Sequence, residues 1–148
     1  MSSRPLDDEA QIRALVAAYA ERLDAGDLDG VAALFERGQF RSAHRGQALV
    51  GAADVRAMYE PVVLYEDGTP RTLHVLGNIE ITCDRERGIA SASCVFTVMQ
   101  ARTAGSLQAV LAGRYHDRFE YDDGRWWFAE RVVHPDLIGD LSTHMRRT

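Results

Sequence analysis

The sequence predicts an α+β domain in which a cone-shaped, curved antiparallel sheet wraps around three N-terminal helices and leaves a central pocket. Apolar residues recur at helical spacing in the N-terminal part of the chain, and long alternating segments follow from Thr72 onward. Glycines stand in the middle of two of these segments, where strands longer than the usual 5 to 6 residues can bend. A sheet bent over helices has a hollow side.

The first helix is expected over about Asp8 to Asp24, because its apolar residues form one stripe: Ile12, Leu15, Val16, Tyr19 and Leu23. Gly26 can take the left-handed conformation that ends a helix, and Asp27 can cap a second helix that carries Leu28, Val31, Leu34 and Phe35. A third helix is expected from about Ala52, with Val55, Met58, Tyr59, Val62 and Val63 facing inward. Pro61 should kink or end it.

A short strand is expected at Gln39 to Arg45, followed by a connection over Gly46 to Gly51. The long strands are expected at Thr72 to Cys83, Ile89 to Arg102, Leu107 to Tyr121 and Trp126 to His134. Turn residues separate them, including the hairpin sequence Asp122-Asp123-Gly124. Gly77 and Gly113 mark the two expected bends.

The composition and charge of the chain exclude some classes of protein. The 148 residues suit one domain, and 46% hydrophobic with 26% charged residues is typical of a globular protein. A net charge of −5 without a Lys/Arg cluster argues against nucleic acid as a partner. No apolar run is long enough to span a bilayer, and Met1 to Asp8 lacks the apolar stretch of a signal peptide, so we expect a cytoplasmic protein and no membrane partner.

Metal and nucleotide chemistry are not expected. Cys83 and Cys94 lack the spacing of a zinc site and fit half-buried strand positions. The histidines other than His74 show no H-E-x-x-H pattern, and no glycine-rich phosphate loop or G-x-S-x-G elbow is present. We therefore expect no cofactor and no metal.

Asp24 is the first candidate for chemistry. It lies off the apolar stripe, on the flank with Ala17 and Ala20, where small side chains leave room for a ligand. A carboxylate in the last helical turn is unfavourable against the helix dipole, so it calls for another explanation. The alternative is an exposed turn residue beside Ala25 and Gly26.

His74 is the second candidate. Leu73 and Val75 alternate with it, which puts His74 on the opposite face of the strand together with Leu76 and Asn78. An imidazole in a pocket can act as a general base near neutral pH. The alternative is a histidine with a structural role.

Arg131 is the third candidate. Trp127, Ala129 and Arg131 are two residues apart, so in a strand their side chains share one face. If that face lines the cavity, the guanidinium could hold an anionic or carbonyl oxygen. Simple pairing with an acidic neighbour is an equal alternative.

Four stretches resemble the SnoaL-like branch of the nuclear transport factor 2-like superfamily: AERLDAGDLD at 20–29, RTLHVLGN at 71–78, GRYHD at 113–117 and DGRWWFAER at 123–131. The resemblance runs from about Asp8 to Asp136 and leaves 137–148 as an extension. It is nearest to scytalone dehydratase, hexachlorocyclohexane dehydrochlorinase and the bile acid 7α-dehydratases. In these enzymes an aspartate that ends the first helix orients a histidine that abstracts a proton, and Asp24 and His74 fall on those positions. Arg131 falls on an arginine of the dehydrochlorinase.

The resemblance therefore implies a cofactor-independent lyase or isomerase, similar to a dehydratase or polyketide cyclase, that acts on a small cyclic apolar metabolite. The alternative is a non-catalytic small-molecule-binding or assembly module. We expect the pocket to be lined by Tyr19, Tyr59, Met58, Leu76, Met99, Tyr115 and Trp127.

We also expect a homodimer or homotrimer, since an open curved sheet exposes apolar residues. In the extension, Leu137, Ile138 and Leu141 should lie on the body, whereas Arg146 to Thr148 should fray.

Overall fold

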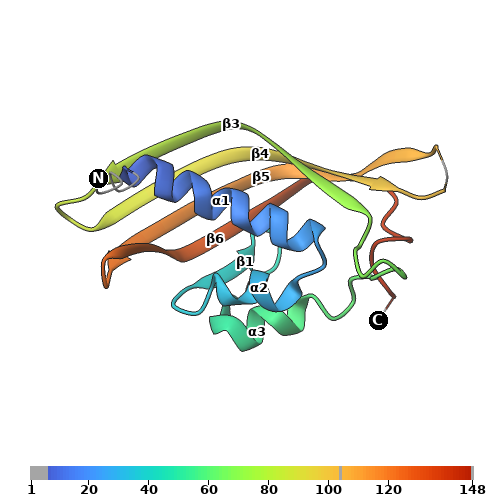
Figure 1. Cartoon of the computed structure of the whole chain (residues 1–148), viewed down its shortest axis with the longest axis horizontal. Helices are drawn as coiled ribbons and strands as arrows, with labels where there is room; N and C mark the ends of the chain where they lie inside the picture. Colours follow the sequence, from blue (N-terminus) through green and yellow to red (C-terminus); the bar gives the residue numbers. More distant parts are fainter. Residues whose placement is uncertain (1–6, 104, 148) are drawn as a thin grey trace, which may run out of the picture.

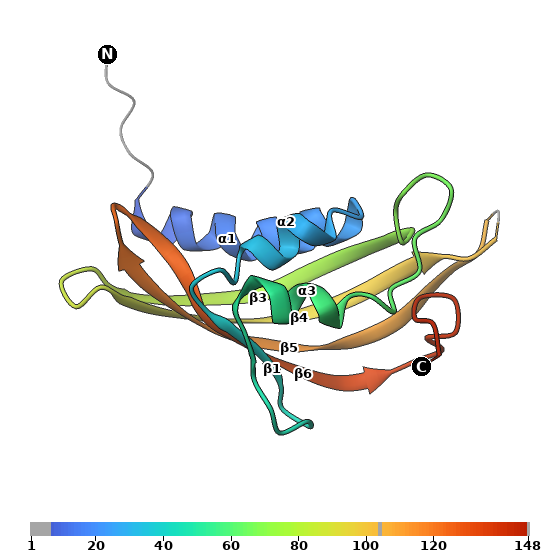
Figure 2. The same cartoon turned by 90° about the horizontal axis from the view of Figure 1, so that it is seen from below.

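In the computed structural model, one curved sheet forms a layer and three helices pack against its concave side (Figures 1 and 2). The structure describes residues 7–103 and 105–147. This arrangement confirms the predicted α+β class. In the described part of the chain, no helix has both the length and the hydropathy needed to cross a membrane.

The helices begin and end close to where local chemistry places them. Helix α1 spans Asp8–Asp24, α2 spans Leu28–Ala33 and α3 spans Gly51–Met58. Gly26 has a φ of +77°, and the Asp27 side chain accepts a hydrogen bond from the Gly30 amide as the cap of α2. Helix α3 ends three residues before Pro61, as expected of a proline that cannot continue it.

The sheet has six strands in the order β2-β1-β6-β5-β4-β3. The four long strands are β3 (Thr72–Asp84), β4 (Ile89–Ala101), β5 (Leu107–Asp122) and β6 (Arg125–Ile138). The short β1 (Gln39–Ser42) pairs in parallel with β6, the one parallel pair among the described strands. Part of the expected connection forms the two-residue strand β2 (Leu49–Val50).

Bulges bend the strands and change which side chains face the helices. The register of β3 on β4 shifts between Gly77 and Glu80, and that of β5 on β6 shifts around Gly113, so both expected bends occur. A methyl group on Gly113 would lie 1.9 Å from the His134 carbonyl oxygen, which explains the glycine. A further shift leaves Ala129 of β6 without a partner.

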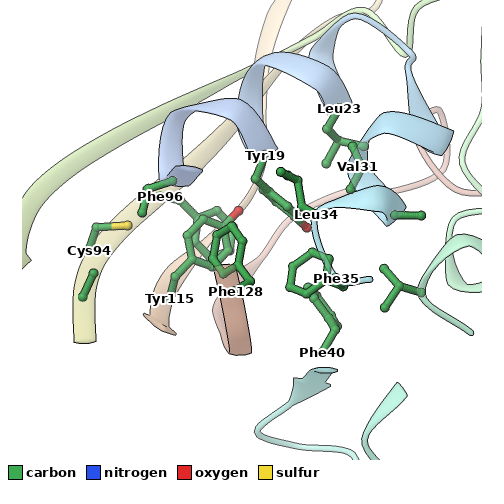
Figure 3. Packing of buried hydrophobic residues seen from close by; sticks show 14 of the residues in the cluster. Tyr19, Leu23, Val31, Leu34, Phe35, Phe40, Cys94, Phe96, Tyr115 and Phe128 are labelled. Carbon is green, nitrogen blue, oxygen red and sulfur yellow. The ribbon is translucent and has the colours of Figure 1, made fainter. Parts of the chain in front are cut away.

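Apolar side chains of helices and sheet meet on the concave side. Tyr19 of α1 packs against Phe35, Phe40 and Tyr115, with ring centroids 5.8–6.4 Å apart (Figure 3). Tyr115 in turn stacks on Phe96 at 4.2 Å. This aromatic cluster fixes the depth of α1 over the sheet.

The outer face of the sheet leaves Leu73, Val75 and Val95 exposed. These apolar residues are of the kind that the expected homodimer or homotrimer would cover, and that assembly stays a prediction.

The segment after His134 differs from expectation. Strand β6 continues to Ile138 by pairing with β5, so the predicted boundary at 137 falls inside the strand. Leu137 and Ile138 are exposed, and their expected docking on the body is wrong. Leu141 does pack on the core, and the Arg146 amide donates to the Pro61 carbonyl at 2.7 Å. Arg146 is thus held, while Thr148 lies outside the described residues.

Candidate active site

The structure brings Asp24 and His74 into direct contact. The Nδ1 atom of His74 lies 2.6 Å from Oδ1 of Asp24. Because a carboxylate only accepts hydrogen bonds, Nδ1 carries a proton, and in the neutral form of the ring Nε2 is then the nitrogen with the lone pair. The Asp24 carboxylate also accepts from the His74 amide and from the Thr72 hydroxyl, each at 2.8 Å. Three donors therefore hold one carboxylate in place.

The end of α1 meets the start of β3 because the chain turns sharply at Gly26. A methyl group on Gly26 would lie 2.0 Å from the carbonyl oxygen of Gly68, in the loop that leads into β3. Only a residue without a side chain allows this approach, and its positive φ also favours glycine. The last residue of α1 is thus pressed against the first residues of β3.

Burial and hydrogen bonding act on Asp24 in opposite directions. Burial raises the pKa of its carboxyl, but the hydrogen bonds from His74 and Thr72 and the attraction to His74 outweigh it, so the pKa lies below its ordinary value. The side chain of Asp24 is 16% exposed and that of His74 is 4% exposed. Asp24 is therefore a carboxylate at neutral pH in a largely dry place.

His74 lines a cavity of about 210 Å³ between the sheet, the helices and the C-terminal turn. Its polar wall consists of His74, His144, Tyr19, Tyr59 and Tyr115, and the remaining lining residues are apolar. The cavity lies below the ~300–1,000 Å³ that is typical of ligand sites, so it has room for a small molecule only. No carboxylate, ammonium or guanidinium group lines it.

Four of the seven expected pocket residues line this cavity: Tyr19, Tyr59, Met58 and Tyr115. The other three do not, which corrects the expectation. Leu76 faces inward but pairs with Phe96 and packs into the core. Met99 alternates with the buried Val98 and Gln100 and so belongs to the outer face.

Trp127 also lies outside the cavity, for a physical reason. The unpaired Ala129 shifts the alternation of β6, so Trp127 and Arg131 point to opposite faces. The Trp127 ring lies at the surface between the guanidinium groups of Arg37 and Arg125.

Arg131 is brought near the site but not onto the cavity wall. Its side chain is fully buried and makes two hydrogen bonds of 2.8 Å to the Asp117 carboxylate. Its guanidinium carbon lies 4.3 Å from the ring centre of Tyr19 and 3.9 Å from that of Tyr115. Burial alone would lower the pKa of Arg131, but Asp117 raises it above the ordinary value. Arg131 is thus a cation behind two tyrosines that line the cavity.

Tyr19 is held by a further contact. The hydroxyl of Tyr19 is hydrogen bonded to the hydroxyl of Tyr59, which follows α3. Burial raises the pKa of Tyr19, and Arg131 partly opposes this rise. The phenols are therefore neutral hydrogen-bonding groups at the cavity.

Sequence reasoning missed the contribution of the C-terminal turn, which supplies Leu141, His144 and Met145 to the cavity wall. The i, i+4 spacing of Leu141 and Met145 was an available signal, whereas nothing in the sequence relates His144 to His74. Within residues 7–103 and 105–147, no group of three or more His, Cys, Asp or Glu side chains could hold a metal ion.

A family model described as SnoaL-like domain matches residues 4–132. A comparison with curated proteins gave no match.

Solved structures are similar along most of their length. An NTF2-like protein with a cystatin-like fold from Novosphingobium aromaticivorans is 23% identical, with a TM-score of 0.73, over 88% of this chain and 83% of that one. A function-unknown protein from Mycobacterium tuberculosis, solved as an aspartate-to-asparagine variant, is 25% identical with a TM-score of 0.70, over 93% and 79%. A candidate scytalone dehydratase from N. aromaticivorans is 23% identical with a TM-score of 0.70, over 91% and 88%. These likenesses support the fold.

Proposed function

We propose that this chain, which belongs to the SnoaL-like domain family, is a cofactor-independent lyase or isomerase that removes a proton from a small cyclic apolar metabolite. The observation that carries the proposal is the hydrogen bond of 2.6 Å between Asp24 and His74 at a cavity wall. His74 is the general base, and Asp24 fixes its tautomer.

In the proposed step, Nε2 of His74 takes a proton from a ring carbon of the ligand, so a C–H bond breaks and an N–H bond forms. The electron pair moves toward a neighbouring oxygen, and the Asp24 carboxylate stabilises the imidazolium. A lyase then expels a leaving group, which departs with a proton, and an isomerase returns the proton to another carbon. Both reactions share the first proton transfer.

Arg131 takes an indirect part in this proposal, because the guanidinium lies behind Tyr19 and is bound to Asp117. We assign it a positioning role. Its charge favours hydrogen bonding by the Tyr19 hydroxyl toward an oxygen that gains negative charge.

A non-catalytic binding module is the competing reading. Such a module needs the apolar wall but has no use for a partly buried carboxylate bound to an imidazole, since burying a charge is costly. The dyad therefore favours the enzyme.

The test follows deuterium entry into 1-indanone, an uncharged ring ketone, in D₂O by NMR. The wild-type protein should speed exchange at the carbon next to the carbonyl, and His74→Ala and Asp24→Asn should lower that rate by about 10²–10⁴-fold. Asp29→Asn is the matched control, because that side chain is 91% exposed, and it should leave exchange unchanged. Equal rates for the wild type and His74→Ala would refute the proposal.

A further inference from the structure

The backbone of His144 is held by hydrogen bonds on both sides although it lies in a short turn. Its amide donates to the Leu141 carbonyl at 3.0 Å, and its carbonyl accepts from the Val63 amide at 2.9 Å. The preceding residue is fixed as well, because Gln100 donates to the Thr143 carbonyl at 3.0 Å and accepts from the Thr143 hydroxyl at 2.8 Å. The backbone that carries the imidazole is therefore held by a buried strand residue and by the segment after α3.

The side chain of His144 is almost fully buried, and one of its two ring nitrogens lacks a hydrogen bond to any described residue. The residue is 7% exposed and lines the same cavity as His74. Its Nδ1 is buried and makes no hydrogen bond among the described residues. A buried polar atom without a partner costs about 1–3 kcal/mol, so such atoms call for an explanation.

The environment keeps His144 neutral. Burial lowers its pKa, and repulsion from His74 lowers it further, while Asp24 opposes both. A neutral imidazole carries one N–H and one bare nitrogen. A buried N–H without a partner costs more free energy than a buried nitrogen lone pair without one. We therefore infer that the buried Nδ1 carries no proton and that the proton is on Nε2.

We propose that Nε2 of His144 donates a hydrogen bond to an uncharged oxygen of the ligand, next to the carbon that faces His74. The inference rests on the proposed function, in which His74 is the base. It narrows the substrate class to cyclic carbonyl compounds without a charged group, because the lining holds no residue to pair with one. Proton removal beside a carbonyl moves charge onto that oxygen, where a neutral N–H can stabilise it.

The test compares two probes that differ by one oxygen. Binding of 1-indanone and of indane is measured by NMR titration for the wild type, His144→Phe and His144→Gln. Phenylalanine keeps the ring and removes the donor, so affinity for 1-indanone should fall about 5- to 10-fold, while that for indane stays within about 2-fold. Glutamine keeps an N–H and should recover most of the lost affinity. His116→Phe, at an exposed histidine, should leave the affinity for both probes unchanged.

The outcomes separate the two proposals. If His144→Phe weakens both probes equally, or weakens neither, the hydrogen bond to the ligand oxygen is refuted. If 1-indanone does not bind the wild type, the assignment is refuted too. If the oxygen-dependent loss occurs but His74→Ala exchanges deuterium as the wild type does, the role of His144 stands and the proposed reaction fails. Unfolding curves of each variant show whether it is folded.

Discussion

Replacing Asp24 with asparagine should destabilise the fold as well as impair chemistry, because asparagine has the same shape and the wrong pattern of donors. The carboxylate accepts from the Thr72 hydroxyl, the His74 amide and the His74 ring. An amide offers one accepting oxygen, and its NH₂ must face at least one of these donors. One lost hydrogen bond and one unpaired buried donor give a loss of about 2 kcal/mol in the free energy of unfolding.

The loss should depend on pH in a defined direction. The pKa of Asp24 is lowered in the folded protein, so the unfolded chain binds this proton first as the pH falls. The stability that the carboxylate contributes is complete above its unfolded pKa of about 4 and disappears as the pH drops through the lower folded value. The difference between wild type and Asp24→Asn should therefore be full at pH 7 and shrink below about pH 4.

Urea unfolding followed by tryptophan fluorescence measures this difference in the free energy of unfolding. In a thermal melt, the melting temperature of Asp24→Asn should be about 4–8 °C lower than that of the wild type at pH 7. Asp29→Asn makes the same chemical change at an exposed side chain that pairs with Arg56, and it should cost under about 0.5 kcal/mol. The reasoning fails if Asp24→Asn is as stable as the wild type at pH 7, or if the gap between them is the same at pH 3.

Three further changes test other parts of the structure. Gly26→Ala should lower the free energy of unfolding by at least about 1–2 kcal/mol because of its positive φ, and a clash with the facing loop adds to this loss. Gly46→Ala is the control, since a methyl group there meets no atom within 4 Å, and it should be nearly neutral in urea unfolding. Arg131→Met should cost about 3–5 kcal/mol by leaving Asp117 unpaired, and adding Asp117→Leu should recover stability; thermal melts in which the double variant is the less stable would contradict this. Because the pKa of His144 is lowered, the protein should lose stability as pH falls from 7 to 5, and His144→Phe should reduce that slope in urea titrations; an unchanged slope would count against it.

The helix ends could be predicted because a few neighbouring residues decide them. The left-handed Gly26 and the capping Asp27 act within one turn, so neighbouring residues determine the boundary between α1 and α2. The bend in β3 was also predictable, since Gly77 marks it. The Asp24–His74 contact could be expected from the resemblance, and its geometry depends on how closely Gly26 approaches the loop before β3.

The inner face of β6 could not be read from alternation, because its bulge falls on an alanine. Without that bulge, the register that starts at Asp122 and Arg125 would place Glu130 opposite Asp117. The extra residue moves Arg131 there instead and turns Trp127 outward. The position of a bulge without glycine depends on how the sheet packs as a whole.

The parallel pairing of β1 with β6 has a consequence for how the chain folds. The four long strands follow one another along the sequence, so each can pair with its predecessor through a short turn. Gln39 and Glu130, by contrast, are 91 positions apart, and β1 has no sheet to join until β6 exists. Contacts that close so long a loop form slowly. During synthesis the residues of the three helices are therefore made well before the sheet that they cover, and the cavity beside His74 is among the last parts of the molecule to be assembled.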